Sequence, residues 1–324
     1  MSPTTPTPRE SFIAALTGGP PAGRVPHFEL EFFLTMEAFG RVHPSQRHYR
    51  QWDQMSPAER ELHLDDVADL HVTVARTYEH AGIMLHRPGG WGLAEMLSVA
   101  GRVREKSATD HLLLMHGDAT YSLPSGERMM DFVARIADDP QGMKDEAARR
   151  VDAALDRGRR IRNHGALDGF CLCADYCFND NPFLSPAMFD EFVTPYLARL
   201  TGGYRDMGFY VIKHTDGNIM PILDALASTG PHALHSLDPQ GGVDIAEVKR
   251  RVGDRLCLIG NVNCAKLQTG TEQEVIESAR YALQSGMPGG RYVFSTSNCI
   301  YTGLPLKRYE LMLDVWRRQG NYPS

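Results

Sequence analysis

The segment FYVIKHTDGN at residues 209–218 joins a short apolar run to residues that can do chemistry. The apolar run predicts a buried strand, and the segment 219–227 after it is typical of a helix. His214 and Asp216 are two residues apart, so both side chains leave the same face if the extended geometry persists. A histidine and a carboxylate that converge at a strand end can bind a metal ion or move a proton. The alternative is a hydrogen-bonded histidine beside an aspartate that caps the helix.

Other strand candidates in the second half of the chain also end in polar residues. The five candidates recur, with helical segments between them, at residues 170–175, 209–214, 233–237, 256–261 and 291–296. Besides His214 and Asp216, the polar residues in or after these strands include Asp175, Tyr176, His235, Asp238, Asn261, Asn298 and Cys299. In a parallel barrel the carboxyl ends of the strands share one face, which carries the site. Each residue alone could be a turn residue, but five such strand ends in succession favour a common site.

A zinc ion is one occupant that these residue types allow. Zinc accepts histidine nitrogen, carboxylate oxygen and cysteine sulfur, and a catalytic zinc site keeps one position open. His214, Asp216 and Cys299 could supply three ligands, with Cys264 as a substitute. The metal would then act as a Lewis acid on a substrate heteroatom. Without a metal, the same residues would act in general acid–base catalysis.

Composition excludes several classes of protein. The 324 residues are 42% hydrophobic and carry a formal net charge of −6, with no basic stripe or tail, so nucleic acid is not an expected partner. No apolar run approaches the roughly 20 residues that span a bilayer, and the amino terminus lacks the pattern of a signal peptide. The six cysteines are too sparse for a disulfide scaffold, which favours free thiols in the cytoplasm. Cys171, Cys173 and Cys177 lie in or beside an expected strand, where cysteine acts as a small hydrophobe rather than a metal ligand.

The alternation of strands and helices predicts an α/β fold with a parallel sheet. Early strand candidates at 25–31 and 83–87 bring the number to seven, so we expect a (β/α)8 TIM-type barrel whose eighth strand the pattern does not place. A doubly wound open sheet is the alternative, although no G-x-G-x-x-G or Walker loop is present. We expect an amino-terminal helical extension, an extra β-hairpin near 102–123, and one domain over residues 1–324 with residues 1–7 disordered.

The first half of the chain offers fewer candidates. Glu29 and Glu31 alternate with apolar residues in the first strand candidate, so they are either solvated or part of a site. The polar and aromatic segment 40–54 predicts a long loop of the kind that forms lids or binding loops.

Several motifs resemble the uroporphyrinogen decarboxylase superfamily, and within it the corrinoid-associated methyltransferase branch, which includes methylcobamide methyltransferases and O-demethylase-like proteins. The motifs are Arg24-Val25-Pro26, Ser185-Pro186-x3-Asp190-Glu191-Phe192-x2-Pro195, His214-Thr215-Asp216-Gly217-Asn218, Ser236-Leu237-Asp238-Pro239, Val243-Asp244-Ile245 and Ile259-Gly260-Asn261-Val262-Asn263. The resemblance covers nearly the whole chain and implies a (β/α)8 barrel.

Two departures from the family pattern bear on function. Decarboxylases of the superfamily carry an arginine-rich RQAGR stretch near the amino terminus, where this chain has the acidic and apolar segment 29–33. Porphyrinogen decarboxylation is therefore not expected. The methyltransferase branch often binds zinc through His-x-Cys and a late cysteine, whereas here Asp216 stands in place of the first cysteine and either Asn298 or Cys299 in place of the second.

The resemblance implies a methyltransferase that takes a methyl group from a small O-, N- or S-methylated compound. The acceptor would be a separate corrinoid protein or tetrahydrofolate, because no cobalamin domain is visible in the chain. Catalytic roles would fall to Asp175, His214, Asp216 and Asp238, and substrate contacts to Glu29, Glu31, Tyr176, His235, Asn261 and Asn298. A homodimer is a further expectation, and no membrane partner is expected.

Two other functions remain open. The first is a lyase that decarboxylates a different small acid, for which Arg47, Arg50 or Arg87 would clamp the carboxylate. The second is a barrel that binds a ligand or partner protein without turnover.

Overall fold

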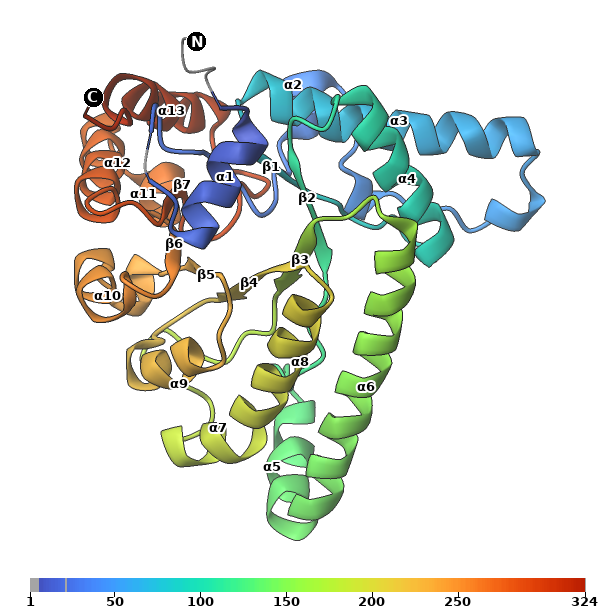
Figure 1. The fold of residues 1–324 in the computed structure, drawn as a ribbon, viewed down its shortest axis with the longest axis vertical. Coiled ribbons are helices and arrows are strands. Elements are labelled where there is room, and N and C mark those ends of the chain that lie inside the picture. Colours follow the sequence, from blue (N-terminus) through green and yellow to red (C-terminus); the bar gives the residue numbers. More distant parts are fainter. Residues whose placement is uncertain (1–5, 21, 324) are drawn as a thin grey trace.

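Within residues 6–20 and 22–323, which the computed structural model describes, seven parallel strands follow one another in chain order around a curled sheet (Figure 1). The strands are β1 (Gly82–Met84), β2 (Leu112–His116), β3 (Gly169–Leu172), β4 (Tyr210–Thr215), β5 (Ala233–Ser236), β6 (Cys257–Val262) and β7 (Tyr292–Thr296). All six neighbouring pairs are parallel. The fold is the expected α/β barrel of TIM type, and the five late strands lie where the alternation of apolar runs and helices predicts them.

The segment 25–32 closes the barrel between β7 and β1. His27 forms parallel bridges with both His80 and Phe294, and Phe32 forms one with Ile300. The backbone N–H of Phe294 donates to Pro26 O at 2.9 Å, and that of Phe28 donates to Phe294 O at 3.1 Å. The first predicted strand therefore occupies a strand position, although its ladder is interrupted and forms only isolated bridges.

The β-hairpin predicted near residues 102–123 is wrong. Residues 102–106 end helix α4 (Leu93–Lys106), and β2 pairs in parallel with β1 and β3 instead of forming a hairpin. Gly117 and Asp118, whose types suggested a hairpin turn, follow the end of β2, and Asp118 accepts hydrogen bonds there. The apolar run of β2 is the strand that the sequence pattern left unplaced.

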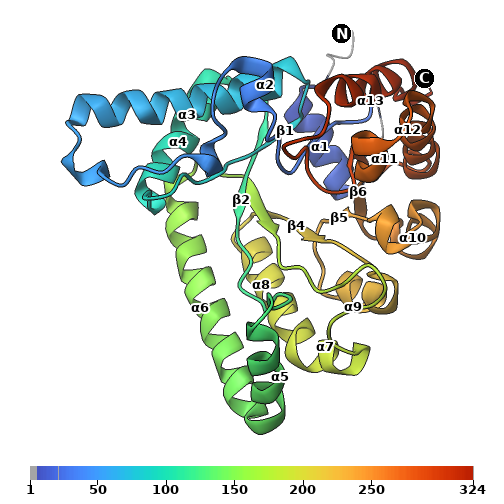
Figure 2. The same ribbon diagram turned by 180° about the vertical axis from the view of Figure 1, so that it is seen from behind.

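Thirteen α-helices accompany the sheet in the described part of the chain. Before and between the first three strands lie α1 (Pro8–Thr17), α2 (Thr35–Phe39), α3 (Pro57–Thr77), α4 (Leu93–Lys106), α5 (Arg128–Asp138) and α6 (Pro140–His164). The remaining helices are α7 (Pro186–Phe192), α8 (Thr194–Asp206), α9 (Leu223–Ser228), α10 (Ile245–Val252), α11 (Cys264–Thr269), α12 (Glu272–Gly286) and α13 (Leu306–Gln319). Figures 1 and 2 show α5 and α6 running together as the longest projection away from the sheet.

Helix α1 is the expected amino-terminal extension, and it packs against the barrel interior. Its Phe12 and Leu16 belong to the same buried cluster as inward residues of the strands, among them Leu112 and Ile212. Thr7 caps the helix, because its side chain accepts from the backbone N–H of Glu10 at 3.2 Å. The disorder expected for residues 1–7 concerns chiefly residues 1–5, which lie outside the described residues.

A buried ion pair ties the carboxyl ends of β2, β3 and β4 together. Lys213 of β4 is fully buried, and its Nζ donates to Asp118 Oδ2 at 2.9 Å and to Leu172 O at 3.1 Å. The carboxylate also accepts from Thr120 Oγ1 and from the backbone N–H of Ala174. Burial opposes ionisation of Asp118, but the Lys213 charge and the hydrogen bonds outweigh it and lower its pKa to about 2.

Candidate active site

A first polar cluster lies at the carboxyl end of β4. The strand delivers His214, the loop after it delivers Asp216, and the loop after β3 delivers Asp175. His214 Nε2 lies 3.7 Å from Asp175 Oδ1 and 3.7 Å from Asp216 Oδ1. The backbone N–H of Asp216 donates to Asp175 Oδ1 at 3.2 Å, which fixes the two loops relative to one another. The structure thus brings together three side chains that the sequence placed at a common rim.

The carboxyl group of Asp216 is held at both oxygens. Asn298 Nδ2 donates to Oδ2 at 2.6 Å, and Ser236 Oγ lies 2.6 Å from Oδ1. Ser236 Oγ also lies 2.5 Å from the carbonyl oxygen of Ser297, which can only accept. Ser236 has one hydroxyl hydrogen, so both contacts are hydrogen bonds only when Asp216 carries a proton. Burial, the largest influence, raises the pKa of Asp216, which also favours the protonated form.

A chain of buried polar groups leads from His214 into the barrel. His214 Nδ1 lies 2.7 Å from His235 Nδ1, and His235 Nε2 lies 3.4 Å from Ser295 Oγ. Ser295 Oγ lies 3.3 Å from Glu29 Oε2, which also accepts from Thr296 Oγ1 at 2.6 Å. Burial raises the pKa of Glu29 to about 8 and holds that of His235 well below its usual value. Both groups are therefore neutral at pH 7. His235 contacts His214 directly, and Glu29 is linked to it through Ser295 and His235.

Asp238 and Asn261 make local contacts with the backbone. Asp238 Oδ1 accepts from the backbone N–H of Gln240 at 2.9 Å, so it caps the short 3-10 helix that follows. Burial, the largest influence, raises its pKa. Asn261 Nδ2 donates to Leu237 O at 2.9 Å. These contacts position the loops after β5 and β6 around the first cluster.

Tyr176 does not open onto the first cluster. Its hydroxyl lies 2.6 Å from Thr120 Oγ1, and the Nζ of Lys213 lies 4.1 Å from its ring centroid. The ring is buried against the ion pair of Lys213 and Asp118, so the geometry gives Tyr176 a packing role.

Two of the three zinc ligands expected from the sequence, His214 and Asp216, lie together in the structure. Within the described residues, the ligand atoms of His214 and Asp216 converge within 4.8 Å with those of Asp175, and Cys299 is not part of that group. Burial raises the pKa of the Cys299 thiol above its usual range, and that of the substitute Cys264 to about 12. Burial disfavours the charged form of both thiols, and zinc binds cysteine as the thiolate, so metal binding there would release protons. The structure therefore groups His214 and Asp216 with Asp175, rather than with Cys299, as candidate metal ligands.

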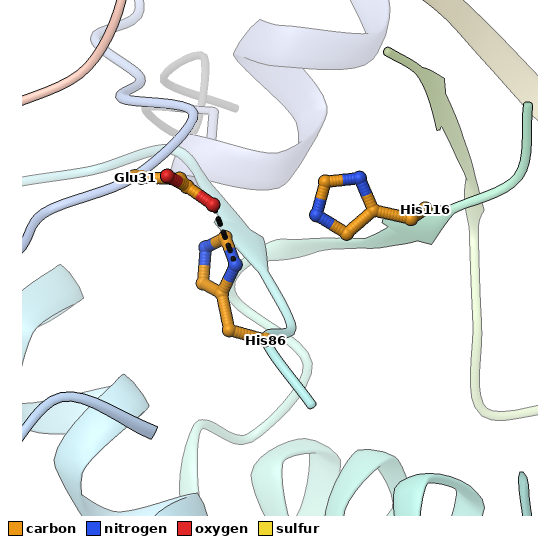
Figure 3. Close-up of side chains that lie close together, drawn as sticks. All are labelled: Glu31, His86 and His116. Atoms are coloured by element: carbon orange, nitrogen blue, oxygen red, sulfur yellow. Dashed lines mark ion pairs between the residues drawn. The ribbon is translucent and has the colours of Figure 1, made fainter. Parts of the chain in front are cut away.

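A second polar cluster lies at the carboxyl ends of β1 and β2 (Figure 3). It consists of Glu31 from the closing segment, His86 after β1, and His116 at the end of β2. His86 Nδ1 lies 3.2 Å from Glu31 Oε1, and His86 Nε2 lies 3.1 Å from Leu30 O. Burial opposes ionisation of Glu31, but the contact with His86 and the nearby His116 and His214 outweigh it and lower its pKa.

A cavity of about 440 Å³ opens beside the second cluster. Polar side chains in its wall include those of Glu31, His86, His116, Arg87 and Arg157, and its apolar wall comes from residues such as Met96 and Met115. Arg47, another expected carboxylate clamp, pairs instead with Asp66, and Arg50 is exposed.

Sequence reasoning missed His86, His116 and Arg157. The rule that found His214, a polar residue at a strand end, also applies to the two histidines. It failed for His116 because residues 102–123 were interpreted as a hairpin. It was not applied to His86, although His86 lies near the end of the strand candidate 83–87. Arg157 lies on α6, and only the tertiary structure brings this helix to the cavity.

A barrel with its polar clusters at the carboxyl ends of the strands has the architecture in which this fold carries active sites. A profile of the uroporphyrinogen decarboxylase (URO-D) family matches residues 129–319, more than half of the sequence. The chain belongs to the uroporphyrinogen decarboxylase family.

Curated relatives match over part of their length. Uroporphyrinogen decarboxylase from Thioalkalivibrio sulfidiphilus is 29% identical over 147 residues, which are 42% of this chain and 39% of that protein. The enzyme of the same name from Shewanella loihica is 30% identical over 128 residues, which are 36% of this chain and 33% of that protein. The chain thus spans about two fifths or less of the curated relatives it matches.

A solved structure shares the fold over the full chain. A methyltransferase from Methanosarcina mazei superposes with a TM-score of 0.68 at 17% identity, covering 97% of this chain and 99% of that one. Within the described residues, no helix combines the length and apolar character that a membrane crossing requires.

Proposed function

We propose that this chain is a methyltransferase that removes a methyl group from a small O-, N- or S-methylated compound. The carrying observation is the half-buried Asp216, whose pKa burial raises, beside His214 and Asp175 at the barrel mouth. The family, and a fold shared with a methyltransferase over 97% of the chain, support this proposal. The acceptor in this proposal is the cobalt of a separate corrinoid protein, or a folate.

The acid cluster fits the chemical demand of methyl transfer. As a nucleophile forms a bond to the methyl carbon, the carbon–heteroatom bond breaks and its electron pair stays on the heteroatom. That heteroatom leaves readily only if it receives a proton, and a positioned acid typically contributes 10²–10⁴-fold to such a step. Asp216 or His214 supplies the proton, and Asp175 balances the charge on the imidazole. This step needs no metal at His214.

The acidic mouth argues against uroporphyrinogen as the substrate. Glu31 is ionised at the mouth, and Glu29 lies buried just before it, in the segment where the resemblance places arginines in the decarboxylases. A substrate rich in carboxylates would meet the negative charge of Glu31 there and would find none of those arginines, which costs binding energy.

A lyase acting on a small carboxylic acid is the second candidate. The observation in its favour is the pair of arginines, Arg87 and Arg157, in the wall of the 440 Å³ cavity. An arginine fork matches the geometry of a carboxylate. The same pair would also suit a methylated substrate that carries a carboxylate.

Organisation and location follow from the same proposal. We propose one barrel domain over residues 1–324, a cytoplasmic location and assembly as a homodimer. The corrinoid protein would meet the chain at the carboxyl face of the barrel, because the polar clusters lie there.

A methyl-transfer assay tests the proposal. The purified chain is mixed with chemically reduced cob(I)alamin and with a methyl ether, a methylamine or a methyl thioether, each with and without a carboxylate. We expect methylcobalamin from at least one donor, and a rate about 100-fold lower in His214→Ala than in His164→Ala, whose histidine is exposed at the end of α6. Release of carbon dioxide without methylcobalamin would overturn the transferase in favour of the lyase. If no donor gives either product, the function that remains is ligand binding without turnover.

A further inference from the structure

We propose that Glu31, His86 and His116 form a binding site for one divalent transition-metal ion, separate from the His214 cluster. The ligand atoms of the three residues lie within 4.8 Å of one another. They come from three different parts of the chain: the closing segment, the end of β1 and the end of β2. Figure 3 shows the His86 ring against the Glu31 carboxylate, with the His116 ring beside them.

The hydrogen bonding of His86 carries the inference. Its Nε2 lies 3.1 Å from the carbonyl oxygen of Leu30, and a carbonyl can only accept, so Nε2 carries a hydrogen. In the neutral ring, Nδ1 is then bare and faces Glu31 Oε1 at 3.2 Å. A proton on Nδ1 joins these two atoms in the absence of metal, and a metal ion that displaces this proton would lie next to both. A metal ion would satisfy both atoms and would use the free lone pair of His86.

The contact with Leu30 also orients the His86 ring for metal binding. A histidine that binds a metal usually donates its other ring N–H to a carbonyl or carboxylate, which fixes the tautomer and the ring orientation. Leu30 immediately precedes Glu31 in the chain, so the same short segment orients one ligand and supplies another. The side chain of His86 is only 4% exposed, and the ring of His43 packs 5.0 Å from it, centroid to centroid. The ring is therefore held in place before any ion binds.

Two histidines and one carboxylate leave coordination positions open. Catalytic metal sites have three protein ligands, whereas structural zinc sites are closed by four. All three residues lie in the wall of the 440 Å³ cavity, so the open positions would face it. Arg87 and Arg157 lie in the same wall, which fits an anionic group of a substrate as a further ligand of the ion.

The inference does not depend on methyl transfer. It concerns residues that the proposed acid chemistry does not use, and direct binding tests it. Zn²⁺ binding is measured by isothermal titration calorimetry with the metal-free chain, and Co²⁺ binding by its visible absorption. We expect one site per chain, a Co²⁺ spectrum of nitrogen and oxygen ligation, and affinity reduced at least 10-fold in Glu31→Gln, His86→Ala and His116→Ala.

Two control variants make the outcome decisive. His164→Ala and His214→Ala should bind as tightly as the parent chain, because neither residue belongs to the cluster. His116 is exposed, so His116→Ala should fold normally even if His86→Ala does not. No binding by the parent chain would overturn the site, and so would parental affinity in His116→Ala and Glu31→Gln. Loss of binding in His214→Ala alone would overturn it too, by moving the metal to the first cluster. None of these outcomes depends on whether the methyl-transfer assay succeeds.

Discussion

At the scale of single residues, the proposed chemistry depends on a proton carried by Asp216. The residue receives one hydrogen bond from Asn298 and shares a second hydrogen with Ser236, whose own hydrogen goes to a carbonyl. Burial raises the pKa of this carboxyl group, which favours its protonated form, and it lies 3.7 Å from His214 Nε2. A neutral acid can give its proton to a leaving group, whereas a carboxylate cannot.

Asp216→Asn tests that role. The amide has the shape of the carboxyl group but no acidic proton, so the fold should persist and the turnover rate should fall by about 10²–10⁴-fold. Rates from the methyl-transfer assay are compared with the melting temperature of the same variant. Asp190→Asn, at an exposed position on α7, serves as the matched control. A variant that melts like the parent and keeps its full rate would remove Asp216 from the chemistry.

Part of the site was predictable from residue spacing. The pair of His214 and Asp216 follows from a strand that ends between them, and Asp175 follows from the same rule one strand earlier. The contact of His214 with His235 depends on strand register, which sequence periodicity leaves open. The sequence left open whether Asn298 or Cys299 lies beside Asp216, because a one-residue choice in the loop after β7 decides it, and the structure places Asn298 there.

At the element scale, the ion pair of Lys213 and Asp118 joins three strand ends. Lys213→Met would leave the Asp118 carboxylate buried without its cation. Breaking a buried pair in this way costs about 3–5 kcal/mol of unfolding free energy, measured by urea denaturation. The double variant Lys213→Met with Asp118→Asn should recover part of that loss, because no charge is then buried. If the two single losses simply add in the double variant, the pair is not coupled.

The elements themselves were largely predictable. The late strands are short apolar runs between amphipathic helices, and this alternation indicates a parallel sheet without further information. The β2 region was misinterpreted because Gly117 and Asp118 are common turn residues, and local sequence does not reveal that Asp118 is held by a lysine 95 residues away. Tertiary contacts here override the local preference of the turn.

At the scale of the whole molecule, Glu29 links the closure of the barrel to pH. Its pKa is 4.5 in an unperturbed chain and about 8 in the fold, so folding takes up a proton between these values. Its contribution to stability is therefore greatest below pH 4.5 and is lost as the pH rises through about 8. Buried histidines such as His27, whose pKa is lowered to about 4, act in the opposite direction.

The comparison of Glu29→Gln with the parent chain isolates this effect. We expect the variant to gain stability relative to the parent between pH 5 and pH 8, by up to about 1.4 kcal/mol for each pH unit. Unfolding free energies in urea at four pH values measure the difference. Glu272→Gln, at an exposed position on α12, should show no such trend. A constant difference between Glu29→Gln and the parent would mean that Glu29 is ionised in the fold.

The start of the family match divides the two polar clusters of the barrel mouth. The family profile begins to match at residue 129, and Asp175, His214 and Asp216 lie in the matched part. Glu31, His86 and His116 all lie before it. The barrel mouth therefore contains two clusters. One lies in the part that matches the family profile, and the other, with the proposed metal ligands, lies before that part. Sequence change in the first half can alter what the cavity binds while the acids of the second half stay in place.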